Sequence, residues 1–159
     1  MEPTVYPAFL TPWETCKLLG TNSRQLLTIL RPYVLALALP SSGARRDHRF
    51  PSAYVRAYRD YLQQRVLPPT PTTAKAFART AEATSLVQRL PREFENSARA
   101  AATGSYLGVD WVTGSLNVCD NTVRKWCNSP TLPSRKSGRI LSVEVEAFIK
   151  AYQWKLPNT

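Results

Sequence analysis

The chain has 159 residues, of which 43% are hydrophobic and 20% charged, so it suits one large or two small folded domains and is too apolar for a disordered tail. No run approaches the roughly 20 apolar residues of a membrane span, and the first residues lack a signal-peptide pattern, so we expect a cytoplasmic protein with no membrane partner. The 21 basic and 11 acidic residues give a net charge of +10, which favours a polyanionic partner.

Side chains suited to catalysis or metal binding are scarce. The chain has one histidine and three cysteines, and their spacing matches no zinc motif. It has no Gly-rich phosphate loop, and its eleven carboxylates are scattered. We therefore expect no enzyme activity, no metal, no cofactor and no disulfide.

The first predicted elements are two short helices between residues 11 and 31. Thr11 can cap the first helix, and Pro12 is tolerated in the first turn because its missing amide has no intrahelical partner. After a short turn, Asn22 can cap the second helix, which must end before Pro32. The two helices share one apolar face, which predicts a helix-turn-helix.

A basic loop follows these helices. Residues 35–39 alternate like a strand and Phe50 begins the return strand, so the loop between them is a candidate wing that reaches phosphates or a minor groove. A solvated turn is the alternative. The candidate DNA contacts in this half are Arg24 and Gln25 on the second helix and Arg45, Arg46, His48 and Arg49 in the wing.

A closing helix is expected from Ser52, with an aromatic face suited to core or subunit packing. Successive prolines at 68–71 then end the first domain. Thr72 or Thr73 can cap a helix to residue 90, and Pro91 can begin another through residue 102. This stretch is either a spacer or a dimerising helix pair, so a homodimer stays open.

The last third of the chain repeats the pattern more clearly. Apolar residues recur at helical spacing with a break at 117–120, which again predicts two helices and a tight turn. An extended piece at 132–133, turn chemistry at 136–139 and a strand at 140–141 predict a second wing, and Ser142 can cap a closing helix. We expect Trp154 to pack on this same part of the chain.

Polar residues point outward from the second of these helices. The candidate contacts to base edges or flanking phosphates are Asn121, Arg124 and Lys125, and those of the wing to the DNA backbone are Arg135, Lys136 and Arg139. Val123 and Trp126 face the core.

The whole pattern aligns with the first part of the chain at an offset of 97 residues, which places Phe9 under Tyr106 and indicates a tandem repeat. Chance agreement of two helical segments is the alternative.

At residues 106–152 the chain resembles the winged-helix domains of MerR-like regulators and phage excisionases, which have two helices, a short Gly-containing wing and a capped closing helix. The resemblance covers about a third of the chain and rests chiefly on the Thr-Val-Arg-Lys-Trp run at 122–126 and on Gly138 with Arg139. Cys119 departs from it, because the family usually has a capping Ser there, so Asp120 is expected to take the cap. The resemblance implies a phage or mobile-element context.

These observations predict a mainly α fold with two winged helix-turn-helix modules, at 1–67 and 105–159, whose short β-hairpin wings flank a helical linker at 68–104. The expected function is sequence-specific binding of double-stranded DNA that controls transcription, recombination or replication, with association to the nucleoid. One alternative is an architectural, excisionase-like or nucleoid-type protein that bends DNA. Another is a protein-interaction module that acts on a recombinase or polymerase.

Overall fold

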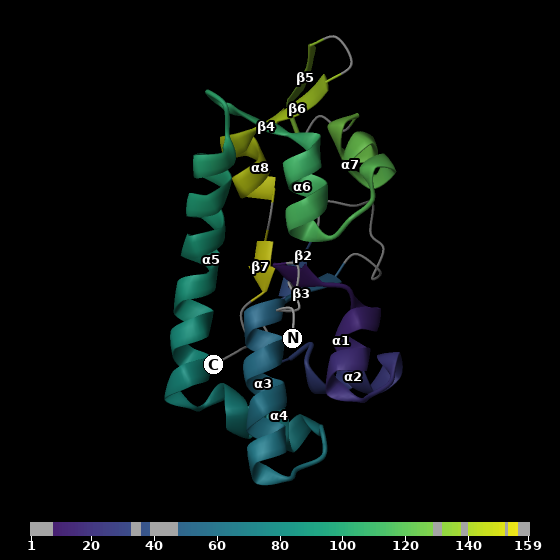
Figure 1. Ribbon diagram of the computed structural model, residues 1–159, viewed down its shortest axis with the longest axis vertical. Helices are drawn as coiled ribbons and strands as arrows, with labels where there is room; N and C mark the ends of the chain where they lie inside the picture. Colours follow the sequence, from purple (N-terminus) through teal and green to yellow (C-terminus); the bar gives the residue numbers. More distant parts are fainter. Residues whose placement is uncertain are drawn as a thin grey trace, which may run out of the picture.

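The computed structural model describes residues 8–32, 36–38, 48–128, 132–137, 140–151 and 153–155. The fold is mainly helical with two small antiparallel sheets, which confirms the predicted class (Figure 1). Two units, called here the first unit and the second unit, lie at opposite ends of an elongated molecule (Figure 1). Within the described part of the chain, no helix combines the length and the apolar character needed to cross a membrane.

The first unit has two helices, three short strands and a closing helix. It consists of β1 (Phe9–Leu10), α1 (Pro12–Leu19), α2 (Ser23–Ile29), β2 (Ala36–Ala38), β3 (His48–Pro51) and α3 (Ser52–Arg65). The predicted caps are confirmed: Thr11 Oγ1 accepts a hydrogen bond from the Glu14 amide at 3.2 Å, and the Glu14 carboxylate accepts one from the Thr11 amide at 2.8 Å. Asn22 Oδ1 accepts from the Gln25 amide at 2.9 Å and so begins α2.

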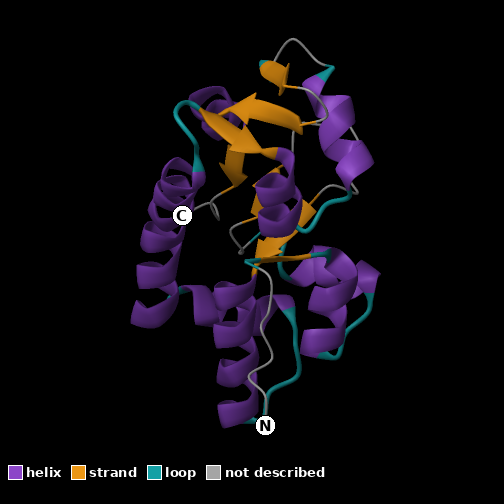
Figure 2. Cartoon of the chain, turned by 45° about the horizontal axis from the view of Figure 1, so that its top comes forward, coloured by secondary structure: helices purple, strands orange, loops and turns teal. Residues whose placement is uncertain are grey.

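The second unit has the same order of elements. It consists of β4 (Tyr106–Gly108), α6 (Val109–Leu116), α7 (Asp120–Cys127), β5 (Ser134–Ser137), β6 (Ile140–Glu144) and α8 (Val145–Ala151). Helices α1 and α6 begin 97 positions apart and end 97 positions apart. In each unit the strand before the first helix pairs antiparallel with the strand before the closing helix, giving the orders β1-β3-β2 and β4-β6-β5 (Figure 2).

The chain end returns to the first unit. Strand β7 (Gln153–Lys155) pairs antiparallel with β2, with Trp154 opposite Leu37, and becomes an edge of the first sheet. The side chain of Trp154, which is expected to pack on the second unit, lies outside the described part of the structure, and only its backbone is placed, beside the first unit. Strand β7 pairs there because β2 has a free edge on the side away from β3, and an added strand satisfies its backbone groups.

Helices α4 (Pro71–Ala78) and α5 (Ala81–Ala101) connect the two units. Their boundary lies at residues 79–80 and not at Pro91 as predicted, because Thr80 Oγ1 caps α5 by accepting from the Ala83 amide at 3.2 Å. Pro91 lies inside α5, where it removes one amide donor. The start of α4 also differs from the prediction, since Thr70 takes the cap and Pro71 the first helical position.

Two predicted caps in the second unit are also wrong. Ser142 caps nothing, because pairing with β4 extends β6 as far as Glu144, whose carboxylate accepts from the Ala147 amide at 2.7 Å. Asp120 is the first residue of α7, and Cys119 occupies the cap position without a side-chain hydrogen bond to the helix backbone.

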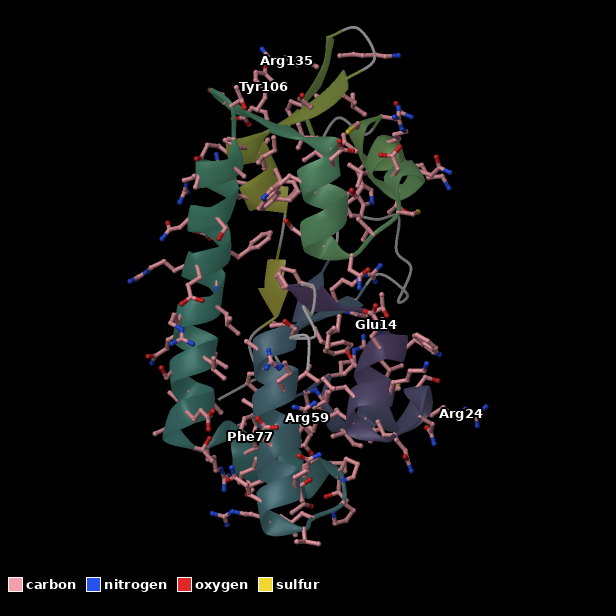
Figure 3. The ribbon with its side chains drawn as sticks, viewed as in Figure 1. Glu14, Arg24, Arg59, Phe77, Tyr106 and Arg135 are labelled. Atoms are coloured by element: carbon pink, nitrogen blue, oxygen red, sulfur yellow. The ribbon has the colours of Figure 1, made fainter. Side chains whose placement is uncertain are left out.

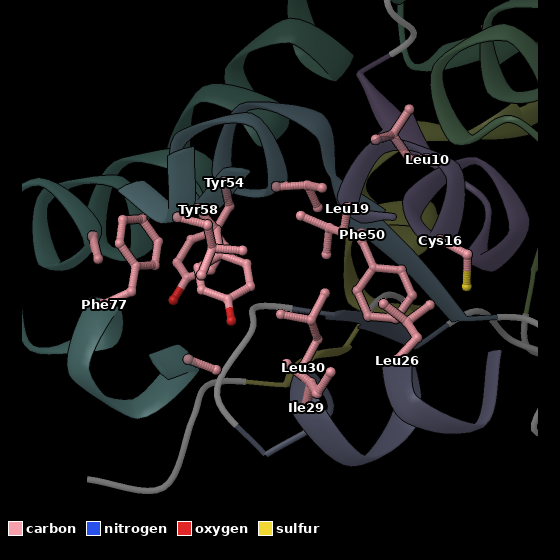
Figure 4. Packing of buried hydrophobic residues seen from close by; sticks show 14 of the residues in the cluster. Leu10, Cys16, Leu19, Leu26, Ile29, Leu30, Phe50, Tyr54, Tyr58 and Phe77 are labelled. Atoms are coloured by element: carbon pink, nitrogen blue, oxygen red, sulfur yellow. The ribbon is translucent and has the colours of Figure 1, made fainter. Parts of the chain in front are cut away.

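The first core cluster fills the space between α1, α2, α3, α4 and the start of α5 (Figure 4). Its aromatic part is the predicted face of α3, in which the rings of Tyr54 and Tyr58 each lie 5.3 Å from that of Phe77 on α4. The Tyr58 hydroxyl lies 2.9 Å from Thr73 Oγ1, which ties α3 to the start of α4. Core packing therefore accounts for the aromatic face of α3.

The second core cluster joins the second unit to the rest of the molecule. It contains Phe94 and Ala98 of α5, whereas Leu86 of the same helix belongs to the first cluster. Phe9 of β1 also belongs to it, with its ring edge-on to that of Phe94 at 5.2 Å. Helix α5 therefore docks along both units, and the predicted linker is a part of both cores.

Candidate nucleic-acid interface

Helix α7 is amphipathic, with one buried and one polar face. Val123 and Trp126 are 0% and 4% exposed and pack in the second core cluster. Asn121, Arg124 and Lys125, at the intervening positions, are exposed. All three predicted contacts on this helix therefore share a solvent-facing surface that the core holds in place.

The first turn of α7 carries two polar pairs. Arg124 Nε donates to Asp120 Oδ2 at 2.6 Å, four residues back on the helix. Cys119 Sγ lies 2.9 Å from Thr122 Oγ1, and this hydrogen bond lowers the pKa of the exposed Cys119 thiol. The ion pair therefore holds the Arg124 side chain against the first turn of α7, and the Cys119 thiol lies at the start of the same helix.

The two described wing residues point to opposite faces of the second sheet. Arg135 stacks on Tyr106, with its guanidinium carbon 3.9 Å from the ring centroid (Figure 3). Side chains alternate along a strand, so the register places Lys136 on the other face, with the buried Leu107 and Val143. Lys136 therefore lies on the sheet face that contributes Leu107 and Val143 to the second core cluster, the cluster in which α7 packs, and Arg135 lies on the other face.

Helix α2 offers a less open surface than α7. Arg24 and Gln25 are exposed, and Gln25 Oε1 accepts a hydrogen bond from Thr21 Oγ1 at 2.8 Å. The same face of α2, with Thr28, borders a hollow of about 300 Å³ whose other wall is the Pro-rich segment 69–71. This neighbouring segment limits the approach of a large partner to α2.

The two helices lie on one side of the molecule. In Figures 1 and 2, α5 runs along one side, and α2 and α7 lie on the other. Arg24 marks the outer surface of the first unit on this side (Figure 3). Both helices therefore lie on the side of the molecule away from α5.

Arg49 and His48 do not belong to this surface. Arg49 Nε donates to the carbonyls of Leu116 and Asn117 at 3.2 and 3.0 Å, so the predicted phosphate contact instead holds the end of α6. His48, predicted at the surface, is only 8% exposed. Both residues lie on β3, an inner strand of the first sheet, which pairs with β1 on one side and β2 on the other.

Asn117 completes this contact from the second unit. Its Nδ2 donates to Glu14 Oε2 at 2.6 Å and to the Phe9 carbonyl at 3.4 Å. Glu14, which is labelled in Figure 3, therefore completes the cap of α1 and accepts from Asn117 with the same carboxylate oxygen. Local patterns indicated a turn at Asn117, but nothing local pairs it with a residue 103 positions away.

The remaining predicted contacts lie outside the described residues. They are Arg45, Arg46 and Arg139.

Among the described residues, His, Cys, Asp and Glu form no group of three that could hold a metal ion.

Comparison of the chain with protein-family models, with curated proteins and with solved structures found no match.

Proposed function

We propose that the protein binds double-stranded DNA in a sequence-specific manner and that α7 is the helix that enters the major groove. The observation that carries the proposal is the pairing on α7 of a buried Val123 and Trp126 with an exposed Asn121, Arg124 and Lys125. The order of elements in each unit, with two helices joined by a short turn, a strand pair and a closing helix, supports the proposal because it is the order expected of a winged helix-turn-helix.

The exposed groups on α7 match the chemistry of base edges. An Asn amide can both donate to and accept from adenine, and Arg or Lys donates to the two acceptors of guanine. Arg124 would have to leave Asp120 to do so, but an ion pair between exposed residues of one helix contributes little. Contact with a base can therefore replace it.

The supporting contacts follow from the faces of the second sheet. Lys136 would hold a phosphate beside α7, and Arg139 would act from the wing turn. Arg135, stacked on Tyr106, would reach only a backbone that passes the outer face. Arg24 and Gln25, with Arg45 and Arg46, would add affinity from the first unit.

The regulated process remains a proposal from the resemblance to phage excisionases and MerR-like regulators. It is the transcription, recombination or replication of a phage or mobile element, in association with the nucleoid. The net charge of +10 supports a polyanionic partner for any of these roles.

Selection of bound fragments from a random duplex pool, followed by affinity measurements over a range of salt concentrations, tests the proposal. We expect a preferred sequence whose affinity falls with salt, with a slope of roughly 0.9 per phosphate contact on logarithmic axes. Uniform binding to all duplexes would indicate the architectural role in its place. Absence of binding at low salt would leave a protein partner and would contradict the proposal.

A further inference from the structure

The first unit carries an open groove on the side of α1 that faces α3. Its volume is about 640 Å³, and it runs between the end of α1, the end of α3 and the prolines that follow. The residues that line it are Lys17, Leu18, Leu19, Gly20, Arg59, Leu62, Gln63, Val66, Leu67, Pro68 and Pro69. Most of these are apolar, and neither α7 nor the second sheet takes part.

Exposed apolar side chains gather at this groove. Among the described residues, the large apolar side chains with the greatest exposure are Val66, Trp13, Leu67 and Leu27. Val66 is 89% exposed and, with Leu67, lines the groove. Trp13, 64% exposed, borders a second hollow of about 540 Å³ that shares Lys17 and Gly20 with the first. The two hollows are therefore parts of one surface, the α1–α3 surface.

Val66 is also strained. It ends α3 in the left-handed region, with φ of 53°, and its amide donates to the carbonyl of Gln63 at 3.3 Å. The caps of α1 and α6 adopt the same conformation with Gly20 and Asn117, two residue types that tolerate it. A β-branched residue does not. Valine here is unfavourable for the fold and is exposed to water, a combination that points to a role outside the isolated chain.

The charges at the α1–α3 surface are basic. Lys17 Nζ lies 3.8 Å above the ring of Trp13, between the two hollows. Arg59 lines the groove from α3, on the side toward α1 (Figure 3), and its partner Asp60 lies outside the lining. Of the described residues that line either hollow, none is acidic. A partner that complements this surface must present apolar side chains together with carboxylates.

A nucleic acid complements it less well. Phosphates would find Lys17 and Arg59, but the apolar groove wall offers them no donors, and sugar–phosphate chains lack the apolar anchors that Val66 and Leu67 would contact. Short peptides bind in such grooves through a few apolar anchors, with charges at the rim. The surface thus favours a peptide.

We propose that the α1–α3 surface of the first unit binds an acidic peptide segment of a partner protein, with apolar anchors against Val66 and Leu67 and carboxylates beside Lys17 and Arg59. This function is separate from DNA binding by α7 and does not rest on it. The protein would then connect a DNA site to a second protein.

Selection of short random peptides on the full-length protein, followed by fluorescence anisotropy with the most enriched synthetic peptide, tests this. We expect enriched peptides to combine Asp or Glu with Leu, Phe or Trp, and their affinity to fall about tenfold in Val66→Asn and in Lys17→Glu. The matched controls are Leu27→Asn on α2 and Lys75→Glu on α4, both outside the lining. They should keep the wild-type affinity.

The stability of Val66→Asn provides an independent readout. Asparagine tolerates the left-handed conformation, so we expect the melting temperature to rise by about 2 °C while peptide affinity falls. A lower melting temperature would overturn the strain argument, and equal affinity of Val66→Asn and wild type would overturn the peptide site. Failure to enrich acidic peptides would also overturn it. Self-association in sedimentation that Val66→Asn abolishes would assign the surface to a second copy of the chain and reject the partner peptide.

Discussion

Arg49 of the first unit donates from Nε to the carbonyl of Asn117, the left-handed residue that ends α6 in the second unit, at 3.0 Å. A second bond from the same nitrogen reaches the Leu116 carbonyl at 3.2 Å. The last carbonyls of a helix have no intrahelical partner and carry a partial negative charge, so a guanidinium is well matched to them. This contact and the Asn117–Glu14 hydrogen bond join the two units directly, and the Phe9–Phe94 ring pair joins the first unit to α5.

Arg49→Ala should destabilise the protein. It leaves partly buried carbonyls without their charged donor, so we expect the free energy of unfolding in urea to fall by about 1–3 kcal/mol. Arg92→Ala, at an exposed position of α5, is the control with the same change of charge. Equal stability of the two variants would mean that the inter-unit hydrogen bonds contribute nothing.

Phe94→Ala should lower a single unfolding transition. Phe94 contacts Phe9 of the first unit and Trp111 and Phe148 of the second, so its loss leaves a cavity where both units meet and should cost about 3–5 kcal/mol. Circular dichroism and tryptophan fluorescence should report the same midpoint, because α5 packs in both clusters. Two separate transitions in the wild type would contradict this coupling.

Pro91→Ala should stabilise the protein. Alanine restores the missing amide donor within α5 and removes the steric conflict of the ring with the preceding turn, for a gain of about 1–2 kcal/mol in thermal unfolding. Loss of stability would show that Pro91 makes a packing contact worth more than the helix defect.

The Cys119 thiol should react faster than an ordinary cysteine near neutral pH. Thr122 hydrogen-bonds its sulfur and lowers its pKa, so more thiolate is present at about pH 7. Thr122→Val removes this bond, raises the pKa and should slow alkylation, and the difference should vanish above about pH 10, where both thiols are ionised. Burial raises the pKa of Cys16, which should react slowly in both proteins. Equal alkylation rates at neutral pH would exclude the Thr122 contact.

Local rules predicted the helices of both units well. Thr11 and Asn22 cap their helices through side-chain oxygens within three residues, and the apolar frame around Val123 and Trp126 follows the helical period. These features depend on near neighbours in the chain. A sequence therefore contains enough information to find them.

Long-range features were not predicted, for physical reasons. Strands β1 and β4 are two and three residues long, too short for a period to be read. The pairing of β4 with β6 extends β6 to Glu144, so that Glu144 and not Ser142 caps the closing helix. An arginine after a basic loop looks like a phosphate contact, and only the tertiary fold brings Arg49 to the end of α6. The cost of a proline inside a helix is a local effect, so the sequence predicts that a helix starts at Pro91. In the structure, packing of α5 against both core clusters offsets this cost and keeps the helix continuous.

The shared core also determines how DNA binding should be tested. Removing residues 1–67 would take Phe9 out of the second core cluster and the Arg49 donor from the end of α6. The truncated protein would therefore lose part of the core on which α7 packs, and a loss of DNA binding could not be assigned to the first unit. Surface substitutions in the full chain avoid this problem.

The most direct test of the central claim compares Arg124→Ala/Lys125→Ala with Lys75→Ala/Arg79→Ala, a double variant at exposed positions of α4 and the residue that follows it, with the same change of charge. The quantity measured is the affinity for the selected duplex divided by the affinity for a shuffled duplex of the same length, both at the same salt concentration. If α7 reads bases, this ratio falls about tenfold or more in the α7 variant and stays at the wild-type value in the control. An unchanged ratio in the α7 variant would contradict the assignment of α7 as the reading helix.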